Sequence, residues 1–237
     1  MYAIENHKVS ESARAHTHLD DATYQRMYRQ SLEQPDQFWA EQAERFLTWD
    51  KRWSKVHESD LSKGQAAWFI DGKLNVSVNC IDRHLAEHGD EIAIIWEGDD
   101  PSQDARISYR ELHDKVCRLA NVLKARGVSK GDRVCLYMPM IPEAAYAMLA
   151  CARISPDALR DRILDADCRA VITADEGVRG GKTVPLKVNV EKALKDCPDV
   201  HTVITVKRTG ADVAWDEKRD VCYTEATSAA SKIGRAS

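Results

Sequence analysis

The sequence predicts an α/β protein, with helices packed on a mostly parallel β-sheet and an α-helical extension at the N-terminus. Two observations support this prediction. Between residues 93 and 206, short apolar runs alternate with stretches of helical periodicity. Before residue 80, the pattern is helical and rich in aromatic residues. Because a helix between two strands of one sheet returns the chain in the same direction, the alternation favours parallel strands.

Length and composition are typical of a soluble globular protein. The chain has 237 residues, 43% of them hydrophobic and 30% charged, which is enough for one large or two modest domains. The net charge of −4 argues against a nucleic-acid or anionic-membrane partner, and no apolar run approaches the roughly 20 residues of a membrane helix. The polar, acidic N-terminus argues against a secretory or mitochondrial leader. Seven widely spaced cysteines without a CxxC pair indicate reduced thiols, so we expect a cytoplasmic protein.

The first 80 residues divide into two predicted segments. Residues 1–20 are polar and patternless, which predicts a mobile lead-in. Residues 21–80 form the predicted helical extension, in which Pro35 separates two helices because proline cannot continue one. Four tryptophans lie within residues 39–68, and we interpret them as packing anchors in preference to a ligand-stacking surface.

Residues 81–223 form the predicted α/β domain. Its most secure element is a helix that starts at a capping box, Ser108 with Glu111, and ends before Gly127. The other expected elements, in chain order, are strand 93–96, strand 134–138, a helix from Pro142, helix 155–168, strand 170–173, helix 184–195, strand 203–206 and an edge hairpin at 215–223. Residues 224–237 are expected to be an irregular tail.

One histidine–cysteine pattern raises the question of a metal site. Residues 80–89 read as a helix, on which Cys80, His84 and His88 recur at four-residue spacing and would share a face. A structural zinc ion needs four ligands, and no fourth is suggested nearby. We therefore favour a solvated helix face and expect no metal site in this chain.

A glycine-basic loop, Arg179-Gly180-Gly181-Lys182, is the one candidate binding site. It follows a predicted strand, where ligands of α/β proteins bind. It is not a Walker A loop, because Glu176 stands where that motif needs its first glycine. Glycines that allow close approach, with two cations beside them, nevertheless favour an anion, against the alternative of a plain surface turn. No Ser/His/Asp or Cys/His grouping and no paired carboxylates stand out as catalytic.

Eight stretches, collinear between about residue 20 and residue 223, carry a family resemblance. They are Gln34–Trp39 (QPDQFW), Leu74–Asn75, Asn79–Leu85 (NCIDRHL), Ala93–Asp100 (AIIWEGDD), Ser108–Leu112 (SYREL), Tyr137–Glu143 (YMPMIPE), Ala147–Ile154 (AMLACARI) and Val171–Lys182 (VITADEGVRGGK). They resemble the N-terminal third of AMP-forming acetyl-CoA synthetases, in the acyl-adenylate-forming family. An unrelated α/β protein is a poor alternative to a collinear match.

The resemblance implies a function for the full-length parent. Acetate and Mg-ATP would give acetyl-adenylate and pyrophosphate, and CoA would then displace AMP. It implies that these residues form part of the large N-terminal domain of such an enzyme. It also implies that Arg179, Gly180, Gly181 and Lys182 contact the phosphates of CoA, with Arg179 and Lys182 as the cations. The expected partners of the parent are therefore the small molecules acetate, ATP and CoA.

The departures from the family pattern predict an inactive fragment. The Ser/Thr/Gly-rich ATP loop, the Tyr-x-Thr-Gly-Asp motif, the acetate-pocket tryptophan and the C-terminal lysine of these enzymes are not found in the 237 residues, and would lie beyond Ser237. We expect this chain alone to lack ligase activity. The alternative from a different functional class is a non-catalytic module that binds CoA or a partner protein.

A second departure is internal. After Ile154 the family continues with a Gly-Ala-x-His-Ser-x-x-Phe-Gly-Gly-Phe segment, whereas here Ile154 abuts Ser155. The interruption predicts that a middle strand of the sheet, about one strand at residues 154–155, is missing. Each backbone group left buried and unpaired would cost roughly 1–3 kcal/mol, so we expect a poorly stable chain.

Overall fold

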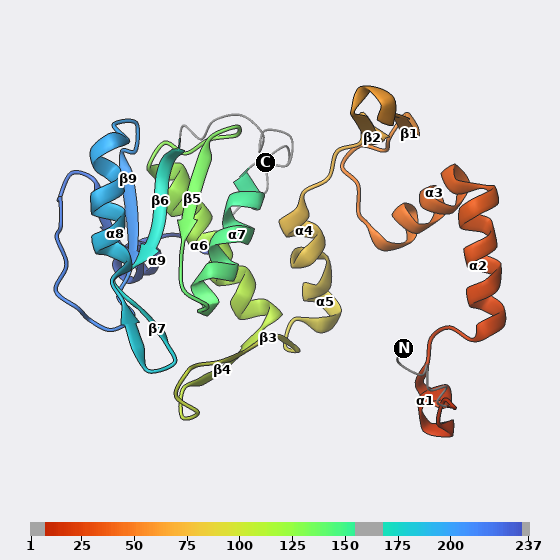
Figure 1. Cartoon of the computed structure of the whole chain (residues 1–237), viewed down its shortest axis with the longest axis horizontal. Helices are drawn as coiled ribbons and strands as arrows, with labels where there is room; N and C mark the ends of the chain where they lie inside the picture. The colour runs from red at the N-terminus through yellow and green to blue at the C-terminus, as the bar shows by residue number, and fades with distance from the viewer. Residues whose placement is uncertain (1–7, 155–167, 234–237) are drawn as a thin grey trace, which may run out of the picture. The chain divides into compact units, whose positions relative to one another are not determined.

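The computed structural model describes residues 8–154 and 168–233. By its internal contacts the chain divides into two compact units, Met1–Gly72 and Lys73–Ser237, which are taken separately below (Figure 1). The helix expected at 155–168 lies outside the described residues, except for Cys168, which begins a strand. No helix of the described residues is long and apolar enough to cross a membrane.

The first unit contains the two helices predicted around Pro35. Helix α2 (Asp21–Glu33) begins at Asp20, whose carboxylate accepts a hydrogen bond from Thr23 N. Helix α3 (Pro35–Phe46) carries Pro35 in its first turn, where a missing N–H leaves no helical hydrogen bond unmade. A short helix not expected from the sequence, α1 (Glu11–His16), lies within the predicted lead-in.

The first unit also contains an antiparallel hairpin that the sequence analysis did not predict. Strands β1 (Lys55–Asp60) and β2 (Gln65–Ile70) are joined by a 3-10 turn, Leu61–Lys63. Two of the four tryptophans are packing anchors, since Trp49 and Trp53 pack edge-to-face with ring centroids 4.8 Å apart and Trp53 is buried, whereas Trp39 and Trp68 are exposed. The rings of Trp49 and Trp53 also contact Phe69, at the end of β2.

The second unit is built on a four-stranded sheet of parallel strands. The strand order is β10-β9-β6-β5, and the bounds are β5 (Arg133–Tyr137), β6 (Cys168–Ala174), β9 (Thr202–Val206) and β10 (Asp220–Cys222). All three strand pairs are parallel, which confirms the predicted α/β class.

The structure departs from three strand expectations. The sheet has no vacant position in its middle, because β5 and β6 are direct neighbours, with Leu136 opposite Ile172. The backbone penalty expected for a lost middle strand therefore does not apply between them. The edge hairpin expected at 215–223 is replaced by β10, which pairs parallel with β9. The strand expected at 93–96 is confirmed as β3 (Ile92–Glu97), but it lies outside the parallel sheet and pairs antiparallel with β4 (Asp104–Ser108) in a separate two-stranded sheet.

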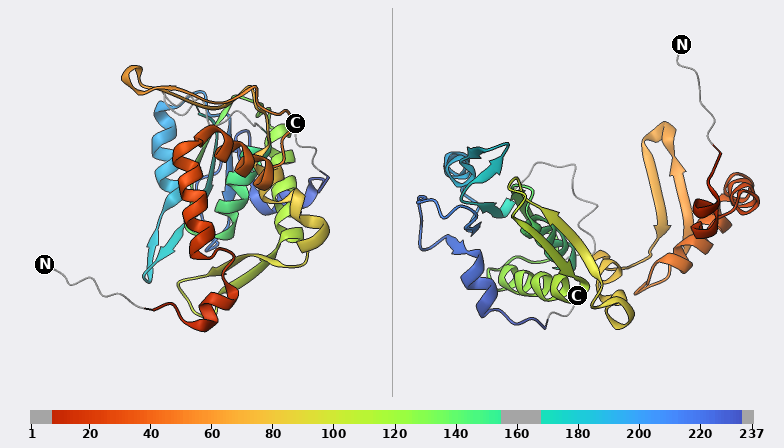
Figure 2. Two further views of the ribbon diagram at one scale, coloured as in Figure 1. Left: turned by 90° about the vertical axis from the view of Figure 1, so that its right-hand side faces the viewer. Right: turned by 90° about the horizontal axis from the view of Figure 1, so that it is seen from below.

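Helices cover both faces of the sheet unequally (Figures 1 and 2). Helices α6 (Tyr109–Ala125), α7 (Pro142–Ile154) and α9 (Tyr223–Ala229) pack on one face, called here the α7 face, and α8 (Leu186–Ala193) packs on the other, called the α8 face. The capping box that starts α6 is present as predicted, with Ser108 Oγ 3.2 Å from Glu111 N. Helix α9 lies at the start of the segment expected to be an irregular tail.

The side chains of each strand alternate between the two faces. On β6, Ala170, Ile172 and Ala174 join a large core with α6 and α7, whereas Val171 joins a small cluster with α8. The same alternation on β5 places Val134 and Leu136 against the large core, and leaves Cys135 and Tyr137 partly open to solvent. The α7 face therefore carries the larger apolar core of the unit.

Candidate functional site

The predicted glycine-basic loop is the tip of a short antiparallel hairpin. Strands β7 (Gly177–Arg179) and β8 (Lys182–Val184) flank a two-residue turn formed by Gly180 and Gly181. Both glycines have positive φ, 57° and 70°, which is the backbone of a type I′ turn. A Cβ atom at either position would meet no atom within 4 Å. The left-handed backbone of the turn therefore favours glycine at both positions.

The two cations of the hairpin are brought together by this turn. Arg179 and Lys182 are directly opposite each other in the antiparallel register, so their side chains leave the same face of the hairpin. Both residues are exposed, and neither makes an ion pair with a described residue. Two adjacent, uncompensated cations on a rigid turn form a site to which an anion with several oxygens is attracted.

A buried carboxylate fixes the root of the hairpin. Asp175 is fully buried at the end of β6, two residues before the hairpin begins. Its carboxylate accepts backbone hydrogen bonds from Arg208 N at 2.7 Å, Gly210 N at 2.8 Å and Ala211 N at 3.1 Å. Burial by itself would raise the pKa of Asp175, but these backbone donors hold that pKa below its ordinary value. The side chain therefore stays ionised and ties the hairpin to the loop that follows β9.

A second buried charge holds the element that follows the hairpin. Lys187, in the first turn of α8, is fully buried, and its Nζ lies 2.9 Å from Asp220 Oδ2 and 3.0 Å from Ala214 O. It also pairs with Glu191 on the same helix. The backbone N of Lys187 donates to Asp175 O. The residues just before and just after the hairpin are therefore both held by buried charged side chains. A single sequence offers no sign that this lysine is buried, because lysine is almost always exposed.

The cysteine and two histidines considered for a metal do not lie on one helix. Helix α4 (Val76–Cys80) ends at Cys80, a 3-10 turn covers Asp82–His84, and α5 (Leu85–His88) follows. His88 Nδ1 lies 2.8 Å from Glu91 Oε1, and the side chain of His88 is exposed. Among residues 8–154 and 168–233, no group of three or more His, Cys, Asp or Glu side chains has the spacing to hold a metal ion.

A cysteine, a histidine and an aspartate that the sequence analysis did not connect do meet inside the second unit. His113 Nε2 lies 3.4 Å from Cys117 Sγ and 3.6 Å from Asp82 Oδ1, so both neighbours use the same ring nitrogen. A catalytic triad needs the nucleophile and the carboxylate on opposite nitrogens. Cys117 is also fully buried, and Asp82 is bound by Arg153 through two 2.7 Å hydrogen bonds. This group is therefore a structural ion-pair cluster.

Comparison with known proteins identifies the family to which the chain belongs. Residues 24–80 match the family described as "Acetyl-coenzyme A synthetase N-terminus", and residues 81–232 match the family described as "AMP-binding enzyme". The second match covers more than half of the chain. The chain belongs to the AMP-binding enzyme family.

Relatives within this family are similar over nearly the whole chain. The chain is 65% identical to acetyl-coenzyme A synthetase 2 of Pseudomonas aeruginosa, over 98% of the chain and 38% of the relative. It is 60% identical to acetyl-coenzyme A synthetase of Saccharophagus degradans, over 92% of the chain and 36% of the relative. The chain therefore spans somewhat more than a third of the length of these curated relatives.

A solved structure of an acetoacetyl-CoA synthetase shares the fold. Acetoacetyl-CoA synthetase from Streptomyces lividans superposes with a TM-score of 0.74 at 27% sequence identity, over 93% of this chain and 35% of that one. The resemblance read from the sequence motifs, to the N-terminal third of acetyl-CoA synthetases, is confirmed by the similarity to such enzymes and by the fraction of their length that is matched.

Proposed function

We propose that this chain contributes the CoA-phosphate-binding hairpin of an AMP-forming acetate–CoA ligase. In the reaction of the whole enzyme, acetate and Mg-ATP give acetyl-adenylate and pyrophosphate, and CoA then displaces AMP. The observation that carries the proposal is the pairing of Arg179 with Lys182 across the Gly180–Gly181 turn, exposed and without carboxylate partners among the described residues. The similarity to acetyl-coenzyme A synthetases supports CoA as the anion.

The hairpin suits a phosphate group for a stated chemical reason. A guanidinium donates two parallel hydrogen bonds to phosphate oxygens, and an ammonium adds a compact charge beside it. The root of the hairpin that presents them is fixed by the carboxylate of Asp175. Little side-chain or loop ordering is then required on binding, apart from the two long side chains themselves.

Calorimetric titration of CoA into the 237-residue chain tests the binding role. Replacing Arg179 with alanine removes the bidentate donor, so we expect affinity to fall about tenfold or more, in line with the ~1.5–3 kcal/mol of a hydrogen bond to a charged group. Lys182→Ala is expected to cost less, because its donors are not matched to the shape of a phosphate. Pantetheine, which lacks the phosphates, should bind equally to all variants.

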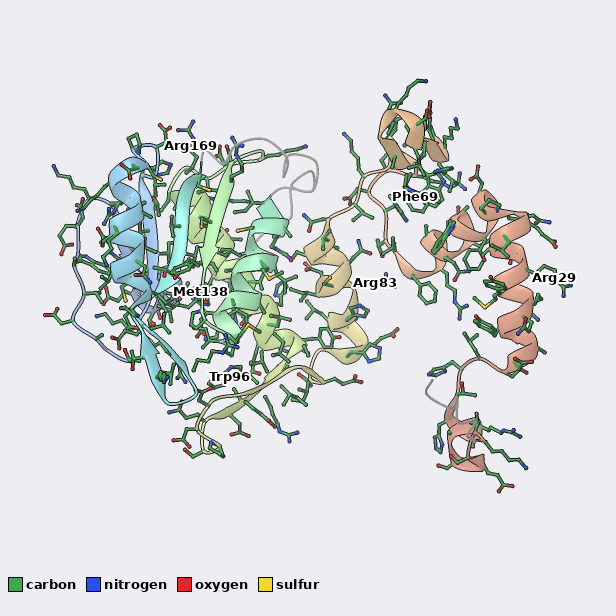
Figure 3. All side chains as sticks on the ribbon, in the orientation of Figure 1. Arg29, Phe69, Arg83, Trp96, Met138 and Arg169 are labelled. Atoms are coloured by element: carbon green, nitrogen blue, oxygen red, sulfur yellow. The ribbon has the colours of Figure 1, made fainter. Side chains whose placement is uncertain are left out.

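Arg29→Ala is the matched control, because it removes the same charge from α2 in the first unit (Figure 3). It should leave CoA binding unchanged. Equal losses in Arg179→Ala and Arg29→Ala would mean that net charge alone attracts CoA. No heat of binding in the unmodified chain would overturn the binding role.

We also propose that the 237 residues do not catalyse acetate activation by themselves. They contain no copy of the family's ATP loop or of its adenylation lysine. Incubation with acetate and Mg-ATP should release no pyrophosphate above the blank, and release that depends on acetate would contradict this. The second candidate function is a non-catalytic CoA- or partner-binding module. CoA binding that depends on Arg179, without any pyrophosphate release, would favour it.

A further inference from the structure

The second unit contains a cavity that lies away from the β7–β8 hairpin. This cavity has no role in the function proposed above. It has a volume of about 330 Å³, which is at the lower end for small-molecule sites. It opens where β9 ends, between the β3–β4 hairpin, the start of α7 and the start of α9. The carboxyl end of a parallel strand is the edge at which ligands of α/β proteins bind.

The walls of this cavity are apolar and aromatic. Trp96 on β3, Tyr146 on α7 and Tyr223 on α9 supply three rings, with Ile107 and Val206 between them. The indole of Trp96, which Figure 3 labels on the hairpin, is fixed in place because its Nε1 donates to Met140 O at 2.7 Å. A flat or branched hydrocarbon body would replace water against these walls.

The charged residues of the cavity are mostly cations. Lys115, Lys207 and Arg208 line it, against the single carboxylate of Glu143. Neither lysine forms an ion pair with any described residue. Arg208 is partly committed, because its Nη2 donates to Gln103 at 2.7 Å and its Cζ lies 5.2 Å from the centre of the Trp96 ring. The lining therefore carries more positive than negative charge, although Glu111, one turn before Lys115 on α6, offsets part of the charge of Lys115.

The ring of Tyr223 forms part of the cavity wall, but its hydroxyl does not open into the cavity. Tyr223 is 6% exposed, and its Oη is buried without a hydrogen-bond partner among the described residues. A ligand in the cavity therefore contacts the ring of Tyr223 and not its hydroxyl. Burial, followed by the nearby Glu143, raises the pKa of Tyr223 well above its ordinary value. Burial likewise raises the pKa of Tyr146 to about 12.

We propose that this cavity binds a small organic carboxylate, with its hydrocarbon body against Trp96 and Tyr146 and its carboxylate held by the cations that line the cavity. A phosphate fits less well. Phosphates favour several free backbone N–H groups at a helix start, but α7 begins with Pro142, which has no N–H, and Ala144 N already donates to Ile141 O.

Protein-observed NMR with benzoate as the probe tests the proposal on the whole chain. The indole Nε1–H signal of Trp96, assigned with Trp96→Phe, should shift in a saturable manner with benzoate. It should respond much less to benzamide, which has the same shape without the charge, or to inorganic phosphate. An equal response to benzamide, a stronger response to phosphate or no saturable response would each overturn the carboxylate site.

Charge variants test the residues that hold the carboxylate. Lys207→Ala on the rim should lower benzoate affinity about tenfold because one hydrogen bond to a charged group is lost. Lys195→Ala, the same charge change on the 3-10 turn after α8, should leave benzoate affinity unchanged. Arg179→Ala should also leave benzoate binding intact, which separates this site from the CoA hairpin. Benzoate affinity that is unchanged in Lys207→Ala, or lowered equally in Lys195→Ala, would refute the assignment.

Discussion

The two faces of the parallel sheet are stabilised by different kinds of interaction. On the α7 face, the strands bury apolar side chains under α6, α7 and α9, and Val116, Leu119 and Leu123 have no exposed surface. On the α8 face, the apolar cluster is small, with Val171, Val190 and Val203 as its buried members. An open groove of about 520 Å³ runs beside α8 over the uncovered part of that face.

Helix α8 combines a small apolar cluster with a large buried ion cluster, whereas α6 and α7 combine a large apolar core with the Arg153–Asp82 ion pair. Its Lys187 is fully buried between Glu191 and Asp220, and Arg219 bridges the same two carboxylates. The difference shows that a helix with few apolar contacts can still be held in one position. A buried ion that moves away from its partners is destabilised, so the ion cluster fixes where α8 lies. Such fixation matters here, since α8 follows directly on the hairpin that we assign to CoA.

The largest expected effect separates the apolar contributions of the two faces. Leu119→Ala removes a fully buried side chain from the α7 face and leaves a cavity, so the free energy of unfolding should fall by about 2–5 kcal/mol. Val190→Ala, on α8, should lower it by only about 1.5 kcal/mol, for two lost methyl groups. Urea unfolding at equilibrium measures both. Equal losses would mean that the α8 face is as well packed as the α7 face.

The next effect tests whether charge holds α8. Asp220→Asn deprives Lys187 and Arg219 of one carboxylate in a buried setting, and should lower the free energy of unfolding by about 3 kcal/mol, more than Val190→Ala does. Asp90→Asn is the control, because Asp90 pairs with Arg110 while remaining 90% exposed, and should change stability by less than about 0.5 kcal/mol. A loss from Asp220→Asn no greater than that of the control would remove charge as the explanation.

The smallest effect is the pH dependence of the ion cluster on the α7 face. The carboxylate of Asp82, followed by Cys117, raises the pKa of His113 to about 10, against roughly 6.5 when unfolded. The stability from protonated His113 is therefore complete below about pH 6.5 and is lost as the pH rises toward 10. Burial alone would raise the pKa of Asp82, but the bonds from Arg153 and His113 hold it well below its ordinary value.

The contribution of Asp82 is therefore present above about pH 4 and is lost as the pH falls below that. Urea midpoints measured from pH 4 to pH 10 should decline above pH 6.5 in the unmodified chain. In His113→Gln, that decline should be reduced, because the group that loses its proton is absent. A variant whose decline matches that of the unmodified chain would exclude His113 as the source.

Local features of the second unit could be predicted from the sequence because neighbours in the chain decide them. The capping box of Ser108 and Glu111 starts α6, and the stripe of Leu112, Val116, Leu119 and Leu123 faces the core as its spacing requires. The apolar runs of β5, β6 and β9 also lie close to where they were expected. The sequence also showed two cations beside the turn glycines, but not that these cations lie opposite each other across the turn.

The tertiary structure alone decided which strands are neighbours and which polar groups are buried. The direct pairing of β5 with β6 and the edge position of β10 depend on contacts between residues far apart in sequence, which periodicity does not encode. The burial of Asp175, Lys187 and Tyr223 follows from the same contacts, because a polar side chain enters the interior only where distant backbone or charge surrounds it. The sequence by itself determined α6, the strands β5, β6 and β9 and the two cations, because neighbours in the chain decide them, and the tertiary structure determined that the cations lie opposite each other on a hairpin.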